Sequence, residues 1–480
     1  MRISVIGCGH LGAVHAACMA DIGHEVLGVD IDEGKTEMLN SGEAWFREPG
    51  LDEMLSRNVA AGRLRFTTSF AEAAKFASIH FLSVATPGLP AGTYDLSQLT
   101  MALTELAQHI TRPAVVIGKS TVPPRTTASL SAIAGEICRH SIDFVWNPEF
   151  LREGWAIQDT LMPDRIVIGA ESETAEAVLR DIYRPLTDAG TPFVVTDFAT
   201  AELVKGAANA FLATKISFIN SMADLCRVVG GDARALAEAL GMDPRIGKSF
   251  LNAGIGYGGG CLPKDVRGLA VFADEVGVHK TSELLMAVDG FNTARRADVV
   301  RMVGEATAGG PVPTQSHARK RIAVWGAAFK PGIDDVRDSP SLDIACRLHD
   351  LGAHVTVYDP VAMGNALEVS PQLTYADSAL EAARDADEVL VATACPEFAS
   401  ISPFATKAVS ASMTVVDACQ GIDNSTWREA GWKVLSLTNK LVETSPPPPS
   451  AGFPQRFGPI GRLEAITGTL SKQLRGPNED

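Results

Sequence analysis

Several features are scarce or missing in this chain of 480 residues, and each absence excludes a class of protein. None of its eight cysteines forms a C-x-x-C pair, so the sequence predicts no zinc or other metal site and no disulfide framework, and a reducing compartment is the simpler interpretation. No apolar run approaches the ~20 residues that a membrane-spanning helix needs. The first residues lack the charged start and long apolar middle of a signal peptide, so we expect a cytoplasmic protein with no membrane partner.

Basic residues are also scarce relative to acidic ones. The formal net charge is -15, and binding to nucleic acid depends on Lys and Arg neutralising a polyanion, so we expect no nucleic acid partner. A single nucleotide is not excluded, because it needs only a few local cations and backbone N–H groups. The apolar fraction of 46% predicts a globular protein with a large core, and the length allows roughly three domains.

Short apolar segments alternate with helix-like segments near both ends of the chain. We expect early strands at residues 3–7, 25–30, 79–85, 114–118 and 144–147. After a Gly/Pro/Ser linker at 308–320 the pattern restarts, since RIAVWG and HVTVYDP mirror ISVIG and EVLGVD, and DEVLVATA echoes IHFLSVAT. Such alternation implies right-handed crossovers and mostly parallel sheets covered on both faces. A coincidence of generic strand patterns is the alternative.

Between the two repeats the pattern becomes helical. Residues 200–230 form one long run without Pro and with apolar positions on more than one side, so we expect a buried helix that packs against a second subunit. More helix follows to about residue 306. The sequence therefore predicts an α/β fold with two Rossmann-like doubly wound domains joined by a central long-helix dimerisation region. Residues 442–480, with SPPPPS, read as a disordered tail.

A glycine fingerprint opens the first repeat. Gly7, Gly9 and Gly12 form G-x-G-x-x-G between the first strand and the first helix, which brings a helix N-terminus to a pyrophosphate. Asp30 ends the next strand about 20 residues on, where a carboxylate binds ribose hydroxyls and repels a 2′-phosphate. The pattern therefore predicts NAD as the cofactor rather than NADP.

The segment GIGYGGGCLPKD, residues 254–265, carries the strongest catalytic signal. Its glycines let backbone approach a ligand closely, and Cys261 follows them at the expected start of a helix, with Lys264 close by. The N-terminus of a helix and the ammonium of Lys264 both favour a thiolate over a thiol, and a nucleophilic cysteine needs the thiolate. Asp265, four residues on, could handle a proton or a water. A buried filler cysteine is the alternative.

Three further groups are candidates. Lys205 and Asn209 lie four residues apart on the long helix, so both can converge on the oxyanion of a tetrahedral intermediate, unless Lys205 is simply solvated. NPEFLREG and KSTVPPRTT follow predicted strands, where ligands of open α/β sheets bind. There Glu149 and Glu153 could bind water or a sugar hydroxyl, and Thr121 could touch the nicotinamide. Ordinary turn chemistry explains either segment equally well.

Taken together, the chain resembles the family of UDP-glucose and GDP-mannose dehydrogenases from Met1 to about Gly421. The matching pieces are GCGHLG, REPGL, KSTVPP, NPEFLREG with PDRIVIG, AELVKGAANAFLATKISFIN, GIGYGGGCLPKD and FKPGIDDVRDSP. The resemblance implies an NAD-binding domain at 1–198, a central dimerisation and cysteine region at 199–307, the linker, and a UDP-sugar domain at 321–441. It also implies a homodimer.

The resemblance further implies the chemistry. A nucleotide-sugar alcohol would be oxidised twice by NAD, through a thiohemiacetal and a thioester on Cys261, with Lys205 and Asn209 on the oxyanion. Asp265, Glu149 and Thr121 would position water and shuttle protons. The implied NAD contacts, besides the fingerprint glycines, are Asp30, Lys35, Thr86, Thr121, Glu153, Lys264 and Arg337. The implied substrate contacts are Glu149, Phe150, Leu151, Arg152, Glu153, Lys205, Asn209, Phe250, Leu251, Asn252, Ala253, Gly254, Gly258 and Lys330, and Arg245 resembles an arginine that reaches a neighbour's substrate.

The segment AANAFLATKISFIN resembles the UDP-glucose branch of that family, with GDP-mannose or a UDP-hexosamine as the alternative substrates. One departure concerns DACQG, where Cys419 and Gln420 replace an expected basic segment. Two other interpretations stay open. A one-step β-hydroxyacid dehydrogenase would need neither Cys261 nor a second α/β half, and a non-catalytic NAD-binding relative would not keep Cys261, Lys205, Asn209 and Asp265 together.

Overall fold

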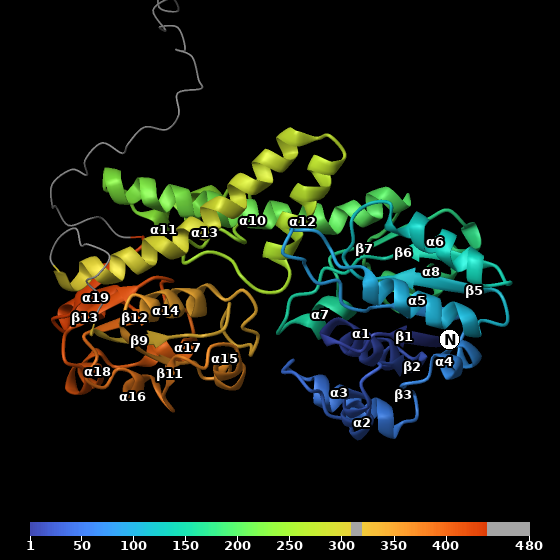
Figure 1. The fold of residues 1–480 in the computed structure, drawn as a ribbon, viewed down its shortest axis with the longest axis horizontal. Helices are drawn as coiled ribbons and strands as arrows, with labels where there is room; N and C mark the ends of the chain where they lie inside the picture. Colours follow the sequence, from blue (N-terminus) through green and yellow to red (C-terminus); the bar gives the residue numbers. More distant parts are fainter. Residues whose placement is uncertain (309–318, 439–480) are drawn as a thin grey trace, which may run out of the picture. The chain divides into compact units, whose positions relative to one another are not determined.

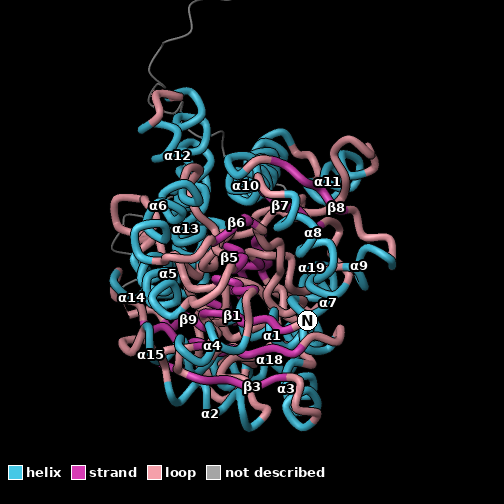
Figure 2. The backbone as a smooth tube through the Cα atoms, turned by 90° about the vertical axis from the view of Figure 1, so that its right-hand side faces the viewer, coloured by secondary structure: helices cyan, strands magenta, loops and turns pink. Residues whose placement is uncertain are grey.

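A computed structural model describes residues 1–308 and 319–438. The predicted linker at 308–320 lies mostly outside the described residues, and the predicted tail at 442–480 lies outside them altogether. Strands and helices alternate along most of the described chain (Figure 1), and strands run through the interior with helices around them (Figure 2). None of the described helices is both long and apolar enough to cross a membrane.

Residues 1–198 contain an eight-stranded sheet in the order β3-β2-β1-β4-β5-β6-β7-β8. Neighbouring strands are parallel except β6 and β7, which are antiparallel. The strands are β1 (Arg2–Ile6), β2 (Glu25–Val29), β3 (Leu64–Thr67), β4 (Ile79–Leu82), β5 (Ala114–Gly118), β6 (Ile142–Trp146), β7 (Ile166–Ala170) and β8 (Phe193–Thr196). The connecting helices are α1 (His10–Asp21), α2 (Glu33–Ser41), α3 (Leu51–Ala60), α4 (Phe70–Phe76), α5 (Ser97–His109), α6 (Thr126–Ile137), α7 (Ala156–Leu161), α8 (Glu173–Ile182) and α9 (Arg184–Asp188).

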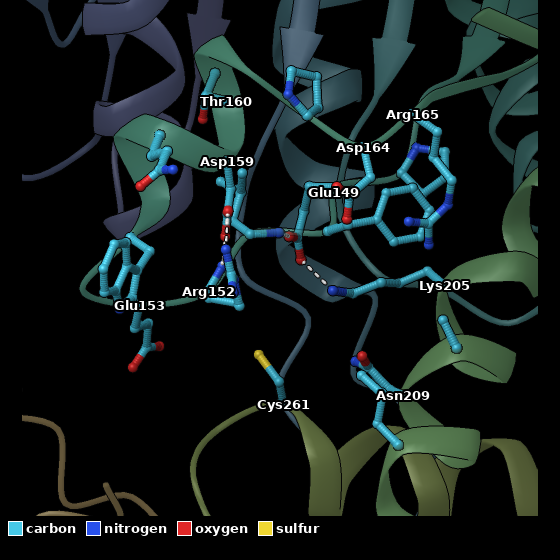
Figure 3. A pocket seen from close by; sticks show the side chains of 18 of the residues that line it. Glu149, Arg152, Glu153, Asp159, Thr160, Asp164, Arg165, Lys205, Asn209 and Cys261 are labelled. Atoms are coloured by element: carbon cyan, nitrogen blue, oxygen red, sulfur yellow. Dashed lines mark hydrogen bonds and ion pairs between the residues drawn. The ribbon is translucent and has the colours of Figure 1, made fainter. Parts of the chain in front are cut away.

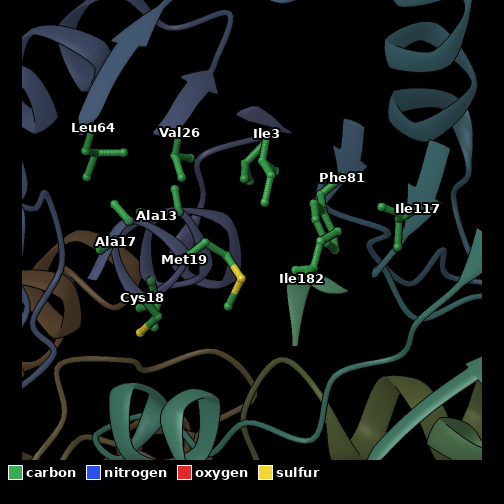
Figure 4. Packing of buried hydrophobic residues seen from close by; sticks show 14 of the residues in the cluster. Ile3, Ala13, Ala17, Cys18, Met19, Val26, Leu64, Phe81, Ile117 and Ile182 are labelled. Atoms are coloured by element: carbon green, nitrogen blue, oxygen red, sulfur yellow. The ribbon is translucent and has the colours of Figure 1, made fainter. Parts of the chain in front are cut away.

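Alternate residues of these strands build two cores, one on each face of the sheet. Ile3 and Phe81 point towards α1, where Ala13, Ala17 and Met19 fill the space beneath them (Figure 4). Their neighbours on the strands pack instead against α4, α5 and α6. A sheet buried on both faces explains why its strands read as unbroken apolar runs in the sequence.

Long helices join the two halves. They are α10 (Phe198–Val229), α11 (Ala233–Gly241), α12 (Leu262–Glu275) and α13 (His279–Ala308). The Asp197 side chain caps α10 by accepting the N–H of Thr200, and Gly230 ends it in the left-handed conformation. Helices α10, α12 and α13 pack on one another. The single long helix that the sequence predicted here is confirmed.

A second sheet, with six strands among residues 319–438, repeats the topology of the first in the order β11-β10-β9-β12-β13-β14. Its strands are β9 (Arg321–Trp325), β10 (His354–Tyr358), β11 (Thr374–Tyr375), β12 (Glu388–Val391), β13 (Thr414–Asp417) and β14 (Lys433–Ser436). Its helices are α14 (Pro340–Asp350), α15 (Met363–Val369), α16 (Ala379–Ala382), α17 (Pro396–Ser400), α18 (Pro403–Val409) and α19 (Asn424–Glu429). The predicted fold class is thus confirmed, whereas the domain limits stay predictions.

Candidate active site

The glycine fingerprint lies between β1 and α1, and its three glycines meet different surroundings. Gly7 has a φ of +88°, and a Cβ on Gly12 would lie 1.8 Å from the carbonyl oxygen of Gly7, so both positions require glycine. A Cβ on Gly9 would meet nothing within 4 Å. The residues present fit a dinucleotide, because an open glycine at a helix N-terminus lets a pyrophosphate approach the backbone.

Asp30 is fixed beside this turn. Its Oδ2 accepts the backbone N–H of Cys8 at 2.9 Å, and its Oδ1 accepts that of Asp32 at 3.1 Å. Lys35 stands on α2 with its ammonium 3.9 Å from a carboxylate oxygen of Asp32 and 4.6 Å from the ring centre of Trp45. Asp30 and Lys35 therefore share the edge of the sheet at which the fingerprint lies.

The other predicted cofactor contacts form two pairs. The hydroxyl of Thr86 donates to the carbonyl of Thr121 at 2.7 Å, which ties the loop after β4 to the loop after β5. Arg337 donates to Glu153 at 3.0 Å, across 184 residues of sequence. Lys264 belongs to neither pair and contacts Asp265 at 2.7 Å.

A cavity of about 860 Å³ lies beside the carboxyl ends of β5 and β6. It is bounded by the loop before α7, by α10, by the start of α12 and by the loop after β9. Figure 3 shows Glu149, Lys205, Asn209 and Cys261 around one space. The predicted catalytic and substrate residues that line it are Glu149, Phe150, Leu151, Arg152, Glu153, Lys205, Asn209, Phe250, Gly258, Cys261 and Lys330.

Lys205 and Glu149 form a buried ion pair in the wall of this cavity. The Lys205 Nζ lies 2.9 Å from Oε1 of Glu149, and the backbone N–H of Leu151 donates to Oε2 at 2.6 Å. Burial raises the pKa of Glu149, but the charge of Lys205 and these hydrogen bonds hold it below its usual range. The solvated alternative for Lys205 is therefore wrong. An ammonium has three N–H donors, so two remain for an oxyanion.

Asn209 lies one turn along α10 and is held by Asp265. Its Nδ2 donates to Oδ2 of Asp265 at 2.6 Å, while Oδ1 of Asp265 lies 2.7 Å from Lys264 Nζ and 3.4 Å from the Tyr94 hydroxyl. Asp265 is fully buried and is not among the residues that line the cavity. These contacts suit Asp265 to orienting Asn209, whose second N–H stays available to a ligand.

Cys261 precedes α12 directly, and its sulfur points into the cavity (Figure 3). The predicted thiolate is wrong for this form of the site, because burial raises the pKa of the thiol to about 11 and Lys205 lowers it only in part. The residue is exposed to the open cavity, yet protein encloses the thiol on its other sides, and Glu149 and Asp265 oppose ionisation. Lys205 favours the thiolate most, and Lys330 and Arg337 also interact with it electrostatically.

The glycines before Cys261 pack closely against the loop that follows β9. A Cβ on Gly258 would lie 2.4 Å from the backbone oxygen of Asp338, and one on Gly260 would lie 2.6 Å from the guanidinium of Arg337. The run is therefore needed first for close approach of the loop that follows β9. Gly258, Gly259 and Gly260 also line the cavity, so the expected close approach of a ligand to this backbone stays a prediction.

Some predicted substrate residues lie outside the cavity. Leu251, Asn252, Ala253 and Gly254 are not among its lining residues, and Arg245 is exposed on the surface, paired with Asp243 at 2.6 Å. Gln420 donates to the carbonyl of Ala253 at 3.1 Å and accepts from Arg234 at 3.1 Å. The altered DACQG segment thus fastens this loop to α11.

The cavity also contains residues that sequence reasoning missed. Lys119 and Asn147 line it, and both belong to segments already expected to follow strands, so position was the available signal. His15 and Tyr183 line it from α1 and from the turn after α8. No motif singled out either of them.

Comparison with known proteins gives consistent matches along the chain. Residues 1–187 match the NAD binding domain of the UDP-glucose/GDP-mannose dehydrogenase family, residues 199–294 match its central domain, and residues 323–424 match its UDP binding domain. These matches follow one another in order and cover most of the described residues.

Named relatives are similar over nearly their whole length. The UDP-glucose 6-dehydrogenase of Haloferax volcanii is 41% identical over 411 residues, which are 84% of this chain and 93% of that protein. That of Rhizobium meliloti is 42% identical over 406 residues, 84% of this chain and 91% of that protein. A solved UDP-glucose dehydrogenase from Pyrobaculum islandicum superposes with a TM-score of 0.82 at 35% identity, covering 91% of this chain and 97% of that one.

Proposed function

The chain belongs to the UDP-glucose/GDP-mannose dehydrogenase family, and we propose that it oxidises UDP-glucose to UDP-glucuronate with NAD as the hydride acceptor. One observation carries the proposal. Cys261, Lys205 and Asn209 face one cavity of about 860 Å³, although 52 residues or more separate the cysteine from the other two. A cysteine facing two N–H donors suits acyl chemistry on sulfur.

NAD supplies a hydride acceptor at each of the two oxidation steps. The C6 alcohol first loses a hydride to the acceptor and its hydroxyl proton to a base, which gives an aldehyde. The Cys261 sulfur then bonds to the carbonyl carbon of this aldehyde, and its thiol proton passes to the carbonyl oxygen, which gives a thiohemiacetal. Loss of a hydride and the hydroxyl proton leaves a thioester. Water then bonds to the same carbon, the C–S bond breaks, and the thiol and a carboxylate result. Lys205 and Asn209 donate to the oxyanion in the addition steps.

The remaining roles belong to the same proposal. Glu149, held ionised by Lys205, accepts a proton from the substrate or the attacking water, Asp265 orients Asn209, and Thr121 faces the nicotinamide. The cofactor and substrate contacts named from the resemblance stay predictions. A one-step β-hydroxyacid dehydrogenase would not need the second sheet, which counts against that alternative. A non-catalytic relative would not need a cysteine that faces the cavity, which counts against the other.

The choice of UDP-glucose is supported by the two relatives at 41% and 42% identity, both named UDP-glucose 6-dehydrogenase. The test is a panel of UDP-glucose, GDP-mannose, UDP-N-acetylglucosamine and UDP-N-acetylmannosamine with NAD, read by NADH absorbance. We expect the highest kcat/KM for UDP-glucose. A higher value for another sugar nucleotide would overturn the choice of substrate but not the chemistry.

We further propose a homodimer that works in the cytoplasm. Helix α10 exposes Leu203, Phe211, Phe218 and Leu225, and exposed apolar patches often mark surfaces that bind another protein. The exposed Arg245 is available to a second copy. All eight cysteines are free, and the chemistry needs Cys261 reduced, which suits a reducing compartment.

A further inference from the structure

Lys119 is a buried lysine for which the reaction above has no task. It follows β5 directly, lines the cavity and is only 6% exposed. Its Nζ donates to the Oδ1 of Asn147 at 3.0 Å and to the backbone oxygen of the same residue at 3.4 Å. Its ammonium also lies 5.9 Å from the ring centre of Phe81. These partners are neutral, and burying an ammonium among neutral groups is costly without an anion nearby.

Two titratable groups near Lys119, His15 and Tyr183, are disfavoured in their charged forms. His15 faces it from α1, and burial together with the charge of Lys119 lowers the pKa of the imidazole well below its usual value. The buried Nε2 of His15 has no hydrogen-bond partner. The Tyr183 hydroxyl donates to the same Asn147 oxygen at 2.6 Å, and burial raises its pKa. The anion that acts on Lys119 is Glu149, which supports the charged lysine.

Glu149 therefore interacts with two buried cations. Lys205 touches it at 2.9 Å, whereas Lys119 acts on it without direct contact. In the proposed reaction Lys205 also donates to an oxyanion at the addition steps, and the negative charge of that oxyanion offsets part of the effect of Lys205 on Glu149. Charges inside a protein act over longer distances than in water, so a second cation keeps the carboxylate ionised at that moment.

We propose that Lys119 is a positioning residue for this oxidation, whose charge keeps Glu149 ionised and whose bond to Asn147 fixes the segment that carries Glu149. This inference rests on the proposed function, because Glu149 and Lys205 take their roles from it. Burial lowers the pKa of Lys119 to about 8, and Glu149 opposes that shift, so the lysine keeps its proton at neutral pH.

Three substitutions separate charge from hydrogen bonding. Lys119→Arg keeps the charge, Lys119→Gln keeps a donor for Asn147 without the charge, and Lys119→Met keeps neither. The first readout needs no turnover: a water-soluble carbodiimide with an amine modifies protonated carboxyls, and peptide mass spectrometry follows Glu149 across pH. We expect the midpoint to rise by about one pH unit in Lys119→Gln and Lys119→Met and to stay unchanged in Lys119→Arg.

The second readout is the acid limb of kcat, which should shift with the labelling midpoint while KM stays near its original value. Thermal unfolding shows whether Lys119→Met folds. If it does not, the labelling midpoint and the acid limb of kcat are measured on Lys119→Gln instead. An unchanged midpoint in Lys119→Gln overturns the role of charge. If the wild-type chain forms no NADH from UDP-glucose, the proposed function fails, and the labelling still decides whether Lys119 controls Glu149.

Discussion

Enclosure of Cys261 raises the pKa of its thiol to about 11, so the site without ligands favours the neutral thiol over the thiolate. Lys205 favours the anion, but Lys205 is already engaged by Glu149 at 2.9 Å. In the proposed reaction the sulfur therefore loses its proton as it bonds to the aldehyde carbon. The reactivity of Cys261 lies in its placement opposite two N–H donors rather than in a standing negative charge.

This placement predicts how the free enzyme reacts with an alkylating reagent. The rate of iodoacetamide modification at Cys261, followed by peptide mass spectrometry, should keep rising with pH towards the thiol pKa of about 11. The thiolate is the reacting species, so the rate follows its fraction. A plateau already reached below about pH 8 would show a thiolate poised in the resting enzyme.

Replacing the sulfur should remove turnover and spare the cofactor. Cys261→Ser should lower kcat by about a thousandfold or more, since a hydroxyl is a poor nucleophile without an adjacent base. NAD titration should give an unchanged Kd. Cys138→Ser is the matched control, because that half-buried thiol lies far along the chain at the end of α6 and should leave kcat as it is. Full activity in Cys261→Ser would remove the proposed nucleophile.

Residue spacing predicted some of these contacts and not others. Lys205 and Asn209, four apart on one helix, do face the same cavity, because helical periodicity alone decides it. The ionisation of Cys261 depends on enclosure by segments distant in sequence, which local motifs do not encode. Lys119 begins a segment that the sequence analysis did single out, whereas no motif marked His15.

Two of the elements that bound the cavity contain glycines with different surroundings. They are the glycine run before α12 and the long helix α10. In the run, Gly258 is needed because backbone of another segment occupies the space of its Cβ. In α10, Gly206 has no such neighbour, since a Cβ there would lie 4.0 Å from Leu269, an ordinary contact. The sequence pattern of glycines could not tell these cases apart.

The contrast predicts opposite effects of one substitution. Gly258→Ala should lower the urea midpoint of unfolding, because its Cβ would meet the Asp338 oxygen at 2.4 Å. Gly206→Ala should raise stability by ~1 kcal/mol, because alanine favours a helix interior over glycine. Equal effects at the two positions would contradict the packing described for the run.

Helix α10 also predicts the oligomeric state. Phe218 is 48% exposed on this helix, so Phe218→Glu should convert a dimer into a monomer in analytical ultracentrifugation. Phe404→Glu, at a residue 66% exposed on α18, should leave the dimer intact. A wild-type protein that sediments as a monomer, or a dimer that survives Phe218→Glu, would rule out this face as the interface.

At the scale of the molecule, the second sheet repeats the strand order of the first six strands of the first sheet. Both sheets were expected from the sequence because strand and helix periodicities are local signals. The contacts between the loops of the two sheets were not expected from the sequence. Lys330, for example, donates to the carbonyl of Glu153 across 177 residues, and nothing in the residue spacing indicates that the two loops meet. Residues of both halves line the cavity, as the proposed reaction requires of a site that holds a sugar between cofactor and cysteine.

The stoichiometry of the complete reaction tests this account most directly. With UDP-glucose and excess NAD, the NADH formed is measured by absorbance and the UDP-glucuronate by anion-exchange chromatography. The route through a Cys261 thioester predicts about two NADH for each sugar acid. One NADH per sugar consumed, with an aldehyde released and no uronate, would contradict it.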